Sequence, residues 1–220
     1  MYIDRAAGGF ARSYAPLLAD GVDAGALEQV RRTYTPDRLI GFLAWPEEPV
    51  VRAALRCLGV LGRMEHCRYI AALLHVESDR TAALAEDALW AVWMRAGSPW
   101  GCQLLKQIID TLAAQQLVAA LELATGLTLA EPSYAEAHHQ RGLALSLLER
   151  FDPASDAFRQ TLRLNPYHFA AAAGAGQTML ELGRLRRARE YYHLALKIHP
   201  RLANVRDILA GLDAALHHGC

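Results

Sequence analysis

A pattern of small, small, aromatic and proline residues occurs twice in the carboxy-terminal half of the chain, with 34 residues between the copies. The two copies are Gly142, Ala154, Phe158 and Pro166, then Gly176, Ala188, Tyr192 and Pro200. A period of this length without drift is typical of a helix-turn-helix unit that is copied and stacked, because one unit alone cannot bury its apolar face. The sequence therefore predicts an all-α fold, an α-solenoid of stacked antiparallel helix pairs.

Each copy is expected to form two antiparallel helices. The expected helices span 135–149, 153–164, 169–182 and 187–198. Asp152 is the expected N-cap of the second helix, with Pro153 in its first turn. Gly183 is expected to end the third helix, because glycine tolerates a positive φ. Gly142 and Gly176 fall inside helices, where glycine costs about 1 kcal/mol relative to alanine, and this indicates that a neighbouring helix approaches closely there.

These residues resemble the tetratricopeptide repeat over 135–202. The segment 101–134 resembles a degenerate unit of the same kind, in which Ile108 and Ala124 stand in place of the small residue and the aromatic. Residues 202–216 match only the first helix of a unit and are expected to form a capping helix with one polar side. The resemblance implies a right-handed superhelix whose concave face holds a peptide or a partner helix.

A second, shorter period occurs in the amino-terminal half. The segments 39–62 and 70–93 align at an offset of 31 residues. The run from Pro49 to Gly59 resembles a HEAT repeat, and the resemblance extends over about 35–110. It implies stacked antiparallel helix pairs here as well.

The two periods suggest a division of the chain. We expect HEAT-like helical repeats in 1–100 and tetratricopeptide-like repeats with a C-terminal capping helix in 101–220. The stretch from Ala96 to Pro99 is expected to be a break between helices, since it is too short and too apolar for a flexible linker. The two parts would then form one continuous solenoid.

Charge and hydropathy argue against two classes of partner. Lys+Arg and Asp+Glu both number 23, so the chain has no net positive charge with which to attract nucleic acid. Lys106 and Lys197 are the only lysines, an arginine bias that is typical of a GC-rich, bacterial genome. Because no apolar run approaches roughly 18 residues and no apolar signal segment opens the chain, we expect a cytoplasmic protein with no membrane partner. A longer or exported precursor stays open.

The sequence contains no recognisable motif of an enzyme, a cofactor site or a metal site. The adjacent pairs His138-His139 and His217-His218 would point about 100° apart on a helix and cannot chelate from one face. No His-Glu dipeptide occurs, which removes the metal signatures built on that pair. The cysteines form no CxxC pair and are expected to be free thiols: Cys57, Cys67, Cys102 and Cys220. We expect no catalytic residue, no cofactor and no metal.

Two further groups of residues have alternative explanations. Trp90 and Trp93 share a helix face and are expected in the core or at the seam between the repeat types, whereas an exposed pair would indicate a partner hot spot. An arginine run surrounds the turn into the last repeat helix, either as a solvated turn or as a docking point for an acidic segment or phosphate. Its members are Arg184, Arg186, Arg187 and Arg189.

The first helix of each pair lines the concave face that the resemblance implies. The side chains expected to meet a partner there are Glu136, His139, Gln140, Leu143, Leu147, Ala173, Gln177, Glu181, Asn204 and Asp207. The tetratricopeptide subfamily that clamps C-terminal carboxylates needs Lys, Arg and Asn on this face. This chain has Leu143, Ala170 and Ala173 there, so that ligand is disfavoured. A mostly apolar groove with a few amides suits an amphipathic helix or an apolar peptide.

The sequence is compatible with three hypotheses for the function. The first is a non-catalytic protein–protein interaction module that binds a peptide or a partner helix in the groove. The second is an accessory subunit or self-assembling scaffold that uses the Trp-rich seam. The third, an enzyme, has no motif in its favour. The sequence leaves the partner's identity and the oligomeric state open.

Overall fold

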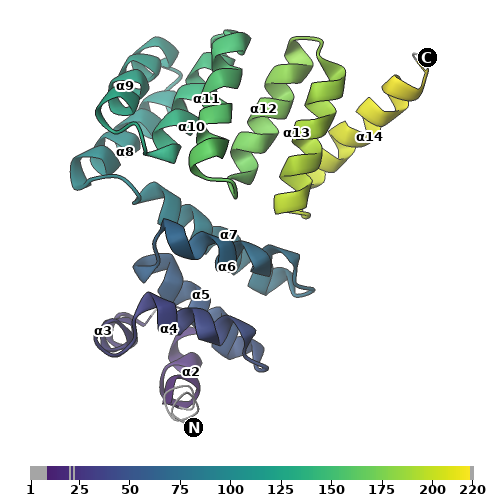
Figure 1. The fold of residues 1–220 in the computed structure, drawn as a ribbon. Coiled ribbons are helices and arrows are strands. Elements are labelled where there is room, and N and C mark those ends of the chain that lie inside the picture. The colour runs from purple at the N-terminus through teal and green to yellow at the C-terminus, as the bar shows by residue number, and fades with distance from the viewer. Residues whose placement is uncertain (1–8, 20, 22, 219–220) are drawn as a thin grey trace. The chain divides into compact units, whose positions relative to one another are not determined.

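The computed structural model describes residues 9–19, 21 and 23–218 (Figure 1). Helices are the only regular elements in these ranges, which confirms the all-α prediction. No described helix is both long and apolar enough to cross a bilayer. Outside the described part lie Cys220 and the side chains of Leu216, His217 and His218.

The chain divides into two compact units, Met1–Trp93 and Met94–Cys220. The boundary that we predicted from the sequence falls after residue 100. That the two units form one continuous solenoid stays a prediction.

The amino-terminal unit combines short helices with two longer ones. Residues 9–13 are helical. The helices that follow them are, in chain order, α2 (Ala15–Leu18), α3 (Ala24–Thr33), α4 (Pro36–Ile40), η1 (Gly41–Ala44), α5 (Glu48–Leu61), η2 (Met64–His66), α6 (Cys67–Ala72), η3 (Leu73–His75) and α7 (Asp79–Met94). The order α4–η1–α5 recurs as α6–η3–α7, and the recurrence has the offset that the sequence period indicated. The assignment of these hairpins to HEAT-like repeats stays a prediction.

Aromatic rings and a partly buried guanidinium hold the start of this unit together. The rings of Phe10 and Phe42 stack with centroids 4.5 Å apart, and Tyr34 meets Phe10 edge-on at 5.4 Å. Arg56 donates a hydrogen bond from Nε to the carbonyl of Leu18 at 2.7 Å. Since the last carbonyls of a helix have no partner within that helix, this contact satisfies the end of α2 and fixes it against α5.

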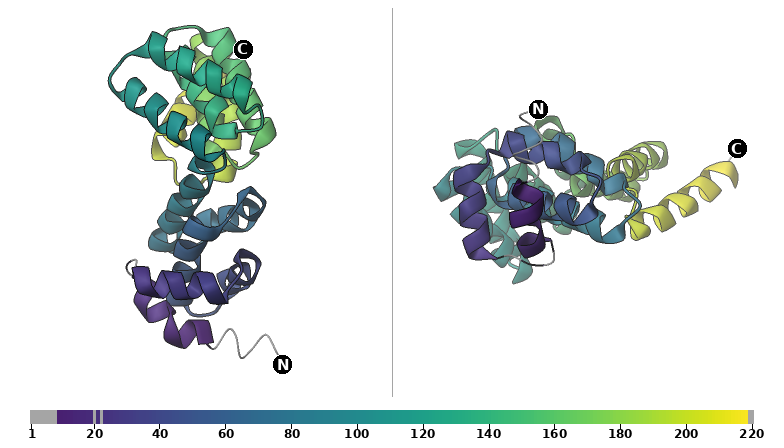
Figure 2. Two further views of the ribbon diagram at one scale, coloured as in Figure 1. Left: turned by 90° about the vertical axis from the view of Figure 1, so that its left-hand side faces the viewer. Right: turned by 90° about the horizontal axis from the view of Figure 1, so that it is seen from below.

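The carboxy-terminal unit is a row of helix pairs followed by a single helix (Figures 1 and 2). The pairs are α8 (Pro99–Ala113) with α9 (Leu117–Ala130), α10 (Ala135–Leu147) with α11 (Phe151–Leu164), and α12 (Phe169–Glu181) with α13 (Leu185–Ile198); α14 (Ala203–His218) follows them. Each helix packs against the next along the chain, and the first helices of successive pairs also touch, α8 with α10 and α10 with α12. The pairs therefore stack in sequence order, as the repeat period predicted.

The repeated glycines permit close contact with an aromatic ring in the same pair. A β-carbon added at Gly142 would lie 2.7 Å from the ring of Phe158, and one at Gly176 would lie 2.8 Å from the ring of Tyr192. Both distances are shorter than carbon atoms can approach without displacement. The predicted close approach is confirmed, and the aromatic of the second helix is the group that approaches.

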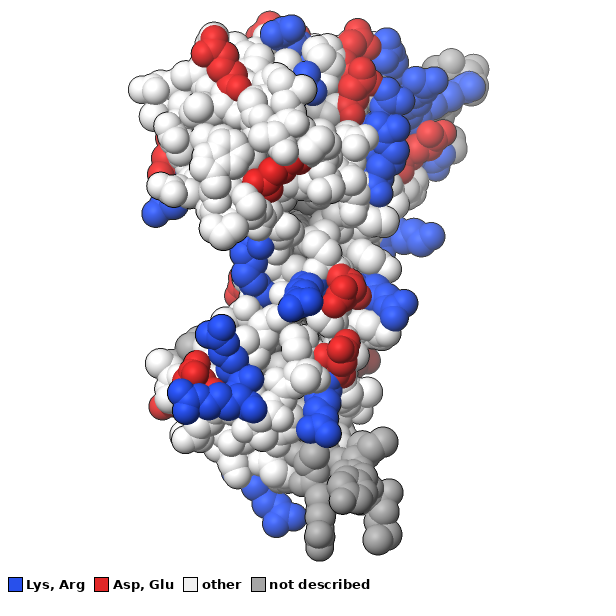
Figure 3. All heavy atoms as spheres, turned by 60° about the vertical axis from the view of Figure 1, so that its left-hand side comes forward, with Lys and Arg blue, Asp and Glu red and all other residues white. Residues whose placement is uncertain are grey.

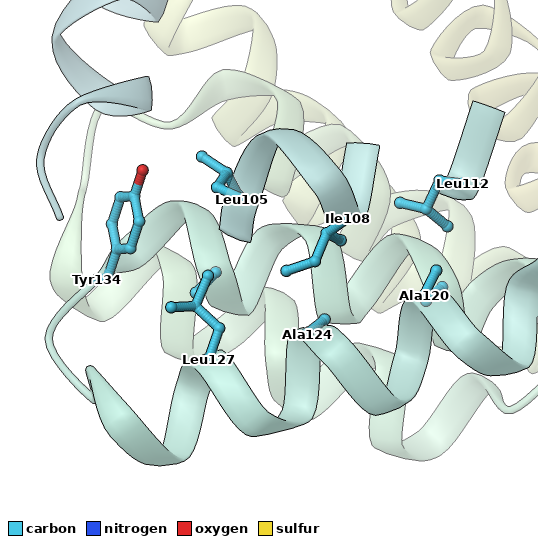
Figure 4. Packing of buried hydrophobic residues seen from close by; sticks show 9 residues of the cluster. Leu105, Ile108, Leu112, Ala120, Ala124, Leu127 and Tyr134 are labelled. Atoms are coloured by element: carbon cyan, nitrogen blue, oxygen red, sulfur yellow. The ribbon is translucent and has the colours of Figure 1, made fainter. Parts of the chain in front are cut away.

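The first pair reaches the same packing with the sizes exchanged. Ile108 occupies the glycine position of this pair and Ala124 the aromatic position, and both are fully buried. Figure 4 shows the two side chains opposite one another, between Leu105 and Leu112 on α8 and Leu127 on α9. The large residue has moved to the first helix and the small one to the second. What looked like degeneracy in the sequence is a compensated exchange of volume, to which cores are tolerant.

The turns inside the three pairs share one left-handed residue. Gln115 and Glu149 have φ of 59°, and Gly183 in the third pair has φ of 68°, which confirms its predicted role. The prediction that Asp152 caps the second helix of its pair is wrong. After the left-handed residue the chain enters α11 at once, so the helix begins at Phe151 and Asp152 lies in its first turn.

Candidate functional site

The ten residues predicted to meet a partner lie on α10 and α12, the first helices of the second and third pairs, and on α14, the single helix that follows them. Four are exposed: Leu147, Glu181, Asn204 and Asp207. Three are partly buried: Leu143, Ala173 and Gln177. Three are buried: Glu136, His139 and Gln140. The first two groups are accessible to a partner, whereas the buried three are turned toward one another.

The buried three form a cluster with a residue from the next pair, His168, and all four side chains are called the Glu136 cluster below. One carboxylate oxygen of Glu136 accepts hydrogen bonds from His139 Nδ1 at 2.9 Å and from Gln140 Nε2 at 2.8 Å. The other oxygen accepts from His168 Nε2 at 2.9 Å. His168 is the residue that precedes α12, so one carboxylate links α10 to the start of the next first helix.

Hydrogen bonding fixes the proton of His168 on one nitrogen. Its Nδ1 accepts the backbone N–H of Ala171 at 3.1 Å and caps α12. A nitrogen that accepts a hydrogen bond carries no proton, so the proton of the neutral ring is on Nε2 and points at Glu136.

Three side chains of the Glu136 cluster are of types that bind metals, but the proton on His168 does not fit an ion at this place. The ligand atoms of Glu136, His139 and His168 lie within 4.8 Å of one another. A ligating histidine binds through an unprotonated nitrogen and donates from the other, which is the reverse of what His168 does here. The arrangement is that of a buried hydrogen-bond network that links two helix pairs.

The electrostatics agree with an ionised Glu136 beside a neutral His168. Burial favours the protonated carboxyl, but the charge interactions and hydrogen bonds with His139 and His168 outweigh it and hold the pKa of Glu136 well below its usual value. Burial is the main cause that lowers the pKa of His168, and the neighbouring His139 adds to it, while Glu136 opposes the shift. At neutral pH the carboxylate therefore accepts three donors without a proton of its own.

The role of His168 in the Glu136 cluster was not predicted from the sequence, and Glu136 and His139 were predicted to lie on the partner surface. One available signal was the three-residue spacing of Glu136 and His139, which places both on one helix face. Another was the period itself, because His168 falls one repeat after Tyr134. The Tyr134 hydroxyl donates to the carbonyl of Met94 at 2.6 Å, so the residue before a first helix makes a polar link to an upstream segment in both pairs.

A second polar group lies on the accessible part of α12. Tyr192 donates from its hydroxyl to Gln177 Oε1 at 2.9 Å, and Gln177 Nε2 donates to Glu181 at 2.6 Å. The amide of Gln177 is thereby held in one orientation, with the carboxylate of Glu181 exposed at the end of the chain of hydrogen bonds. A fixed polar group on a rigid helix lowers the entropy lost when a partner binds.

Trp90 and Trp93 pack against each other in the amino-terminal unit. Trp93 is 1% exposed, and Trp90 is partly buried and meets it edge-on with ring centroids 5.1 Å apart. This agrees with the core explanation and gives no exposed hot spot from the pair. Of the described cysteines, Cys57, Cys67 and Cys102 are free thiols, as expected, and burial raises the pKa of Cys57 to about 12.

No protein-family model and no curated protein matches the sequence. Solved structures do resemble the fold. The first tetratricopeptide domain of Spaghetti (RPAP3), solved with the HSP90 peptide SRMEEVD, gives a TM-score of 0.52 at 20% identity and covers 53% of this chain and 93% of its own. The Sgt2 tetratricopeptide domain from Aspergillus fumigatus gives 0.53 at 14% identity and covers 56% and 82%. The chain has a tetratricopeptide-like fold. Structural likeness at such low sequence identity shows the fold and does not show the ligand.

Proposed function

We propose that this chain is a non-catalytic interaction module that binds a peptide or a partner helix on the surface of α10, α12 and α14. The observation that carries the proposal is the row of stacked pairs whose first helices bear side chains that the core does not use. Leu147, for example, is a large apolar side chain that is 53% exposed. Support also comes from the RPAP3 domain, a tetratricopeptide domain that resembles this fold and was solved with a bound HSP90 peptide.

The partner we propose is apolar, with hydrogen-bonding groups but no free carboxylate at the contact. The proposed contact residues are Leu143, Leu147, Ala173, Gln177, Glu181, Asn204 and Asp207. Leucines would bind an apolar side chain, and Gln177 and Asn204 would bind the backbone. Glu181 and Asp207 would repel a C-terminal carboxylate. The Glu136 cluster would keep α10 and α12 in register beneath this surface.

We also propose that the module acts in the cytoplasm of a bacterium and binds neither nucleic acid nor a membrane. Its amino-terminal unit would consist of HEAT-like repeats that continue into the tetratricopeptide-like row.

A random 12-residue peptide library displayed on phage and panned against the full chain tests the proposal. Selected peptides should be mostly apolar. Their affinity should fall at least about tenfold in a Leu147→Glu, Ala173→Glu double variant, because two charges would then face an apolar ligand. Leu147 is preferred to Leu143 because Leu143 packs against the core.

Leu129→Glu is the matched control for this experiment. Leu129 is also an exposed leucine, at 76%, but it lies on α9, a second helix. Peptides that lose affinity equally in the control and in the double variant, or that keep it in both, would contradict the proposed surface.

A further inference from the structure

A cleft of about 530 Å³ opens between α11 and α13, on the second helices of the carboxy-terminal unit. Its size is within the range of about 300–1,000 Å³ that is usual for ligand sites. Met179 of α12 lines it together with Tyr191 and Leu194 of α13, and Ser155 and charged side chains line the rest. The proposed partner surface does not include any of these residues.

The charges of the cleft are only partly paired among the described residues. Arg184 Nη1 forms an ion pair with Asp152 at 3.1 Å, which joins the first turn of α11 to the start of α13. Arg187 lines the same cleft without an ion pair to a described residue, and Arg186 lines an adjoining hollow that shares Arg184 and Arg187. In the space-filling view, lysine and arginine side chains gather on the side of this unit that carries α13 and α14 (Figure 3). Arg159 and Asp156 of the cleft also form an ion pair, so its three arginines face three carboxylates, and Arg187 and Glu190 are the two without an ion pair to a described residue. Arg186 in the adjoining hollow adds one positive charge, so the cleft and hollow together have four arginines and three carboxylates.

Arg186 and Arg187 lie at positions where an arginine lowers the stability of a helix. Arg186 and Arg187 lie in the first turn of α13, at the positive end of the helix dipole, and that turn has no acidic residue. The corresponding turn of α11 follows the rule, because Asp152 occupies the position one repeat before Arg186. A local rule that is obeyed in one repeat and broken in the next indicates a role other than folding.

The side chains that line the cleft favour some anionic ligands over others. Tyr191 and Leu194 offer apolar surface, which suits a peptide side chain. Asp156 and Glu190 also line the cleft, and they would repel a ligand that is uniformly negative, such as a nucleic-acid backbone. An isolated carboxylate can instead reach the guanidinium groups, which bind it in a bidentate manner.

We propose that the cleft between α11 and α13 is a second binding site, for a peptide segment in which an acidic side chain adjoins an apolar one. The acidic side chain would bind Arg187 and Arg186, and the apolar one would lie against Tyr191 and Leu194. This site differs from the proposed surface of α10, α12 and α14 in position and in ligand charge.

The test is a second panning of a random 12-residue library, against the full chain with Leu147→Glu and Ala173→Glu so that the other surface is impaired. Selected peptides should be enriched in Asp or Glu next to an apolar residue. Their affinity should fall about tenfold or more when Arg186→Glu and Arg187→Glu are added. The same addition should keep or raise the melting temperature, since acidic residues favour a helix start.

The matched control adds Arg163→Glu and Lys197→Glu, which change the net charge equally at exposed sites outside the cleft. These two substitutions should change affinity less than about twofold, because exposed charges far from a ligand are screened. Four results would overturn the proposal. They are selected peptides without acidic enrichment, equal losses in the two charge-reversal variants, a lower melting temperature on reversal of Arg186 and Arg187, and competition by a single-stranded oligonucleotide or inorganic phosphate that exceeds competition by the peptides.

Discussion

Replacing Glu136 by glutamine changes one atom of the buried cluster and leaves its volume nearly unchanged. The carboxylate accepts from His139, Gln140 and His168, whereas an amide has one accepting oxygen and an NH₂ group. If the oxygen serves His139 and Gln140, the NH₂ faces the Nε2 proton of His168. That proton cannot move to Nδ1, because Nδ1 accepts the N–H of Ala171.

At least one buried donor is therefore left without an acceptor, at a cost of about 1–3 kcal/mol. Loss of the negative charge weakens the remaining bonds by about 1 kcal/mol more. We expect Glu136→Gln to lower the free energy of unfolding by about 2–4 kcal/mol. Urea unfolding at pH 7.5, followed by far-UV circular dichroism, measures the difference.

Two comparisons make the test specific. Glu181→Gln, on the exposed part of α12, should change the free energy of unfolding by no more than about 0.5 kcal/mol. The double variant with His168→Gln should cost at least about 1 kcal/mol less than the sum of the single variants, because the two residues share a contact. A Glu136→Gln protein as stable as the wild type, or strict additivity with His168→Gln, would refute the proposed network.

Three further outcomes follow from the structure. Folding lowers the pKa of His168 below 6.5, so as the pH falls the unfolded chain takes up a proton at this histidine before the folded chain does. The stability that neutral His168 contributes should therefore be complete above pH 6.5 and lost as the pH falls below it. Urea titrations at several pH values should show a smaller decline in stability for His168→Asn than for the wild type. Gly176→Ala should cost about 1–3 kcal/mol because its β-carbon meets the ring of Tyr192, whereas Gly211→Ala, which meets nothing within 4 Å, should stabilise by up to about 1 kcal/mol. Gly183→Ala should cost about 1 kcal/mol, because Gly183 has a φ of 68°. Equal melting temperatures for the three glycine variants would contradict the packing described.

Local rules in the sequence were sufficient to predict the carboxy-terminal row. The sequence predicted a close helix approach at Gly176 and a left-handed residue at Gly183, and both depend only on residues of one pair; that the ring of Tyr192 makes the approach is seen only in the structure. The first pair was harder to interpret from sequence, because Ile108 and Ala124 each depart from the pattern. Only their contact across the pair shows that the departures compensate.

The Glu136 cluster could not be predicted because it depends on two pairs at once. Glu136 and His139 lie on a first helix, and amphipathic periodicity alone does not tell whether such a face meets solvent or the next pair. His168 stands in a turn, where a histidine carries no pattern. Its partner is 32 residues away in sequence, and the stacking of α10 on α12 brings the two together.

Photo-crosslinking locates a bound peptide on the chain most directly. Benzoylphenylalanine would be placed at Ala173 on α12, at Leu129 on α9 and at Val60 on α5, in separate proteins incubated with a peptide from the first panning. Val60 and Leu129 are exposed at 51% and 76%, so all three positions are open to a ligand to some degree. We predict a crosslink from position 173 and none above background from 129 or 60. A crosslink from position 129 or 60 but not from 173 would show that the first helices do not hold the partner.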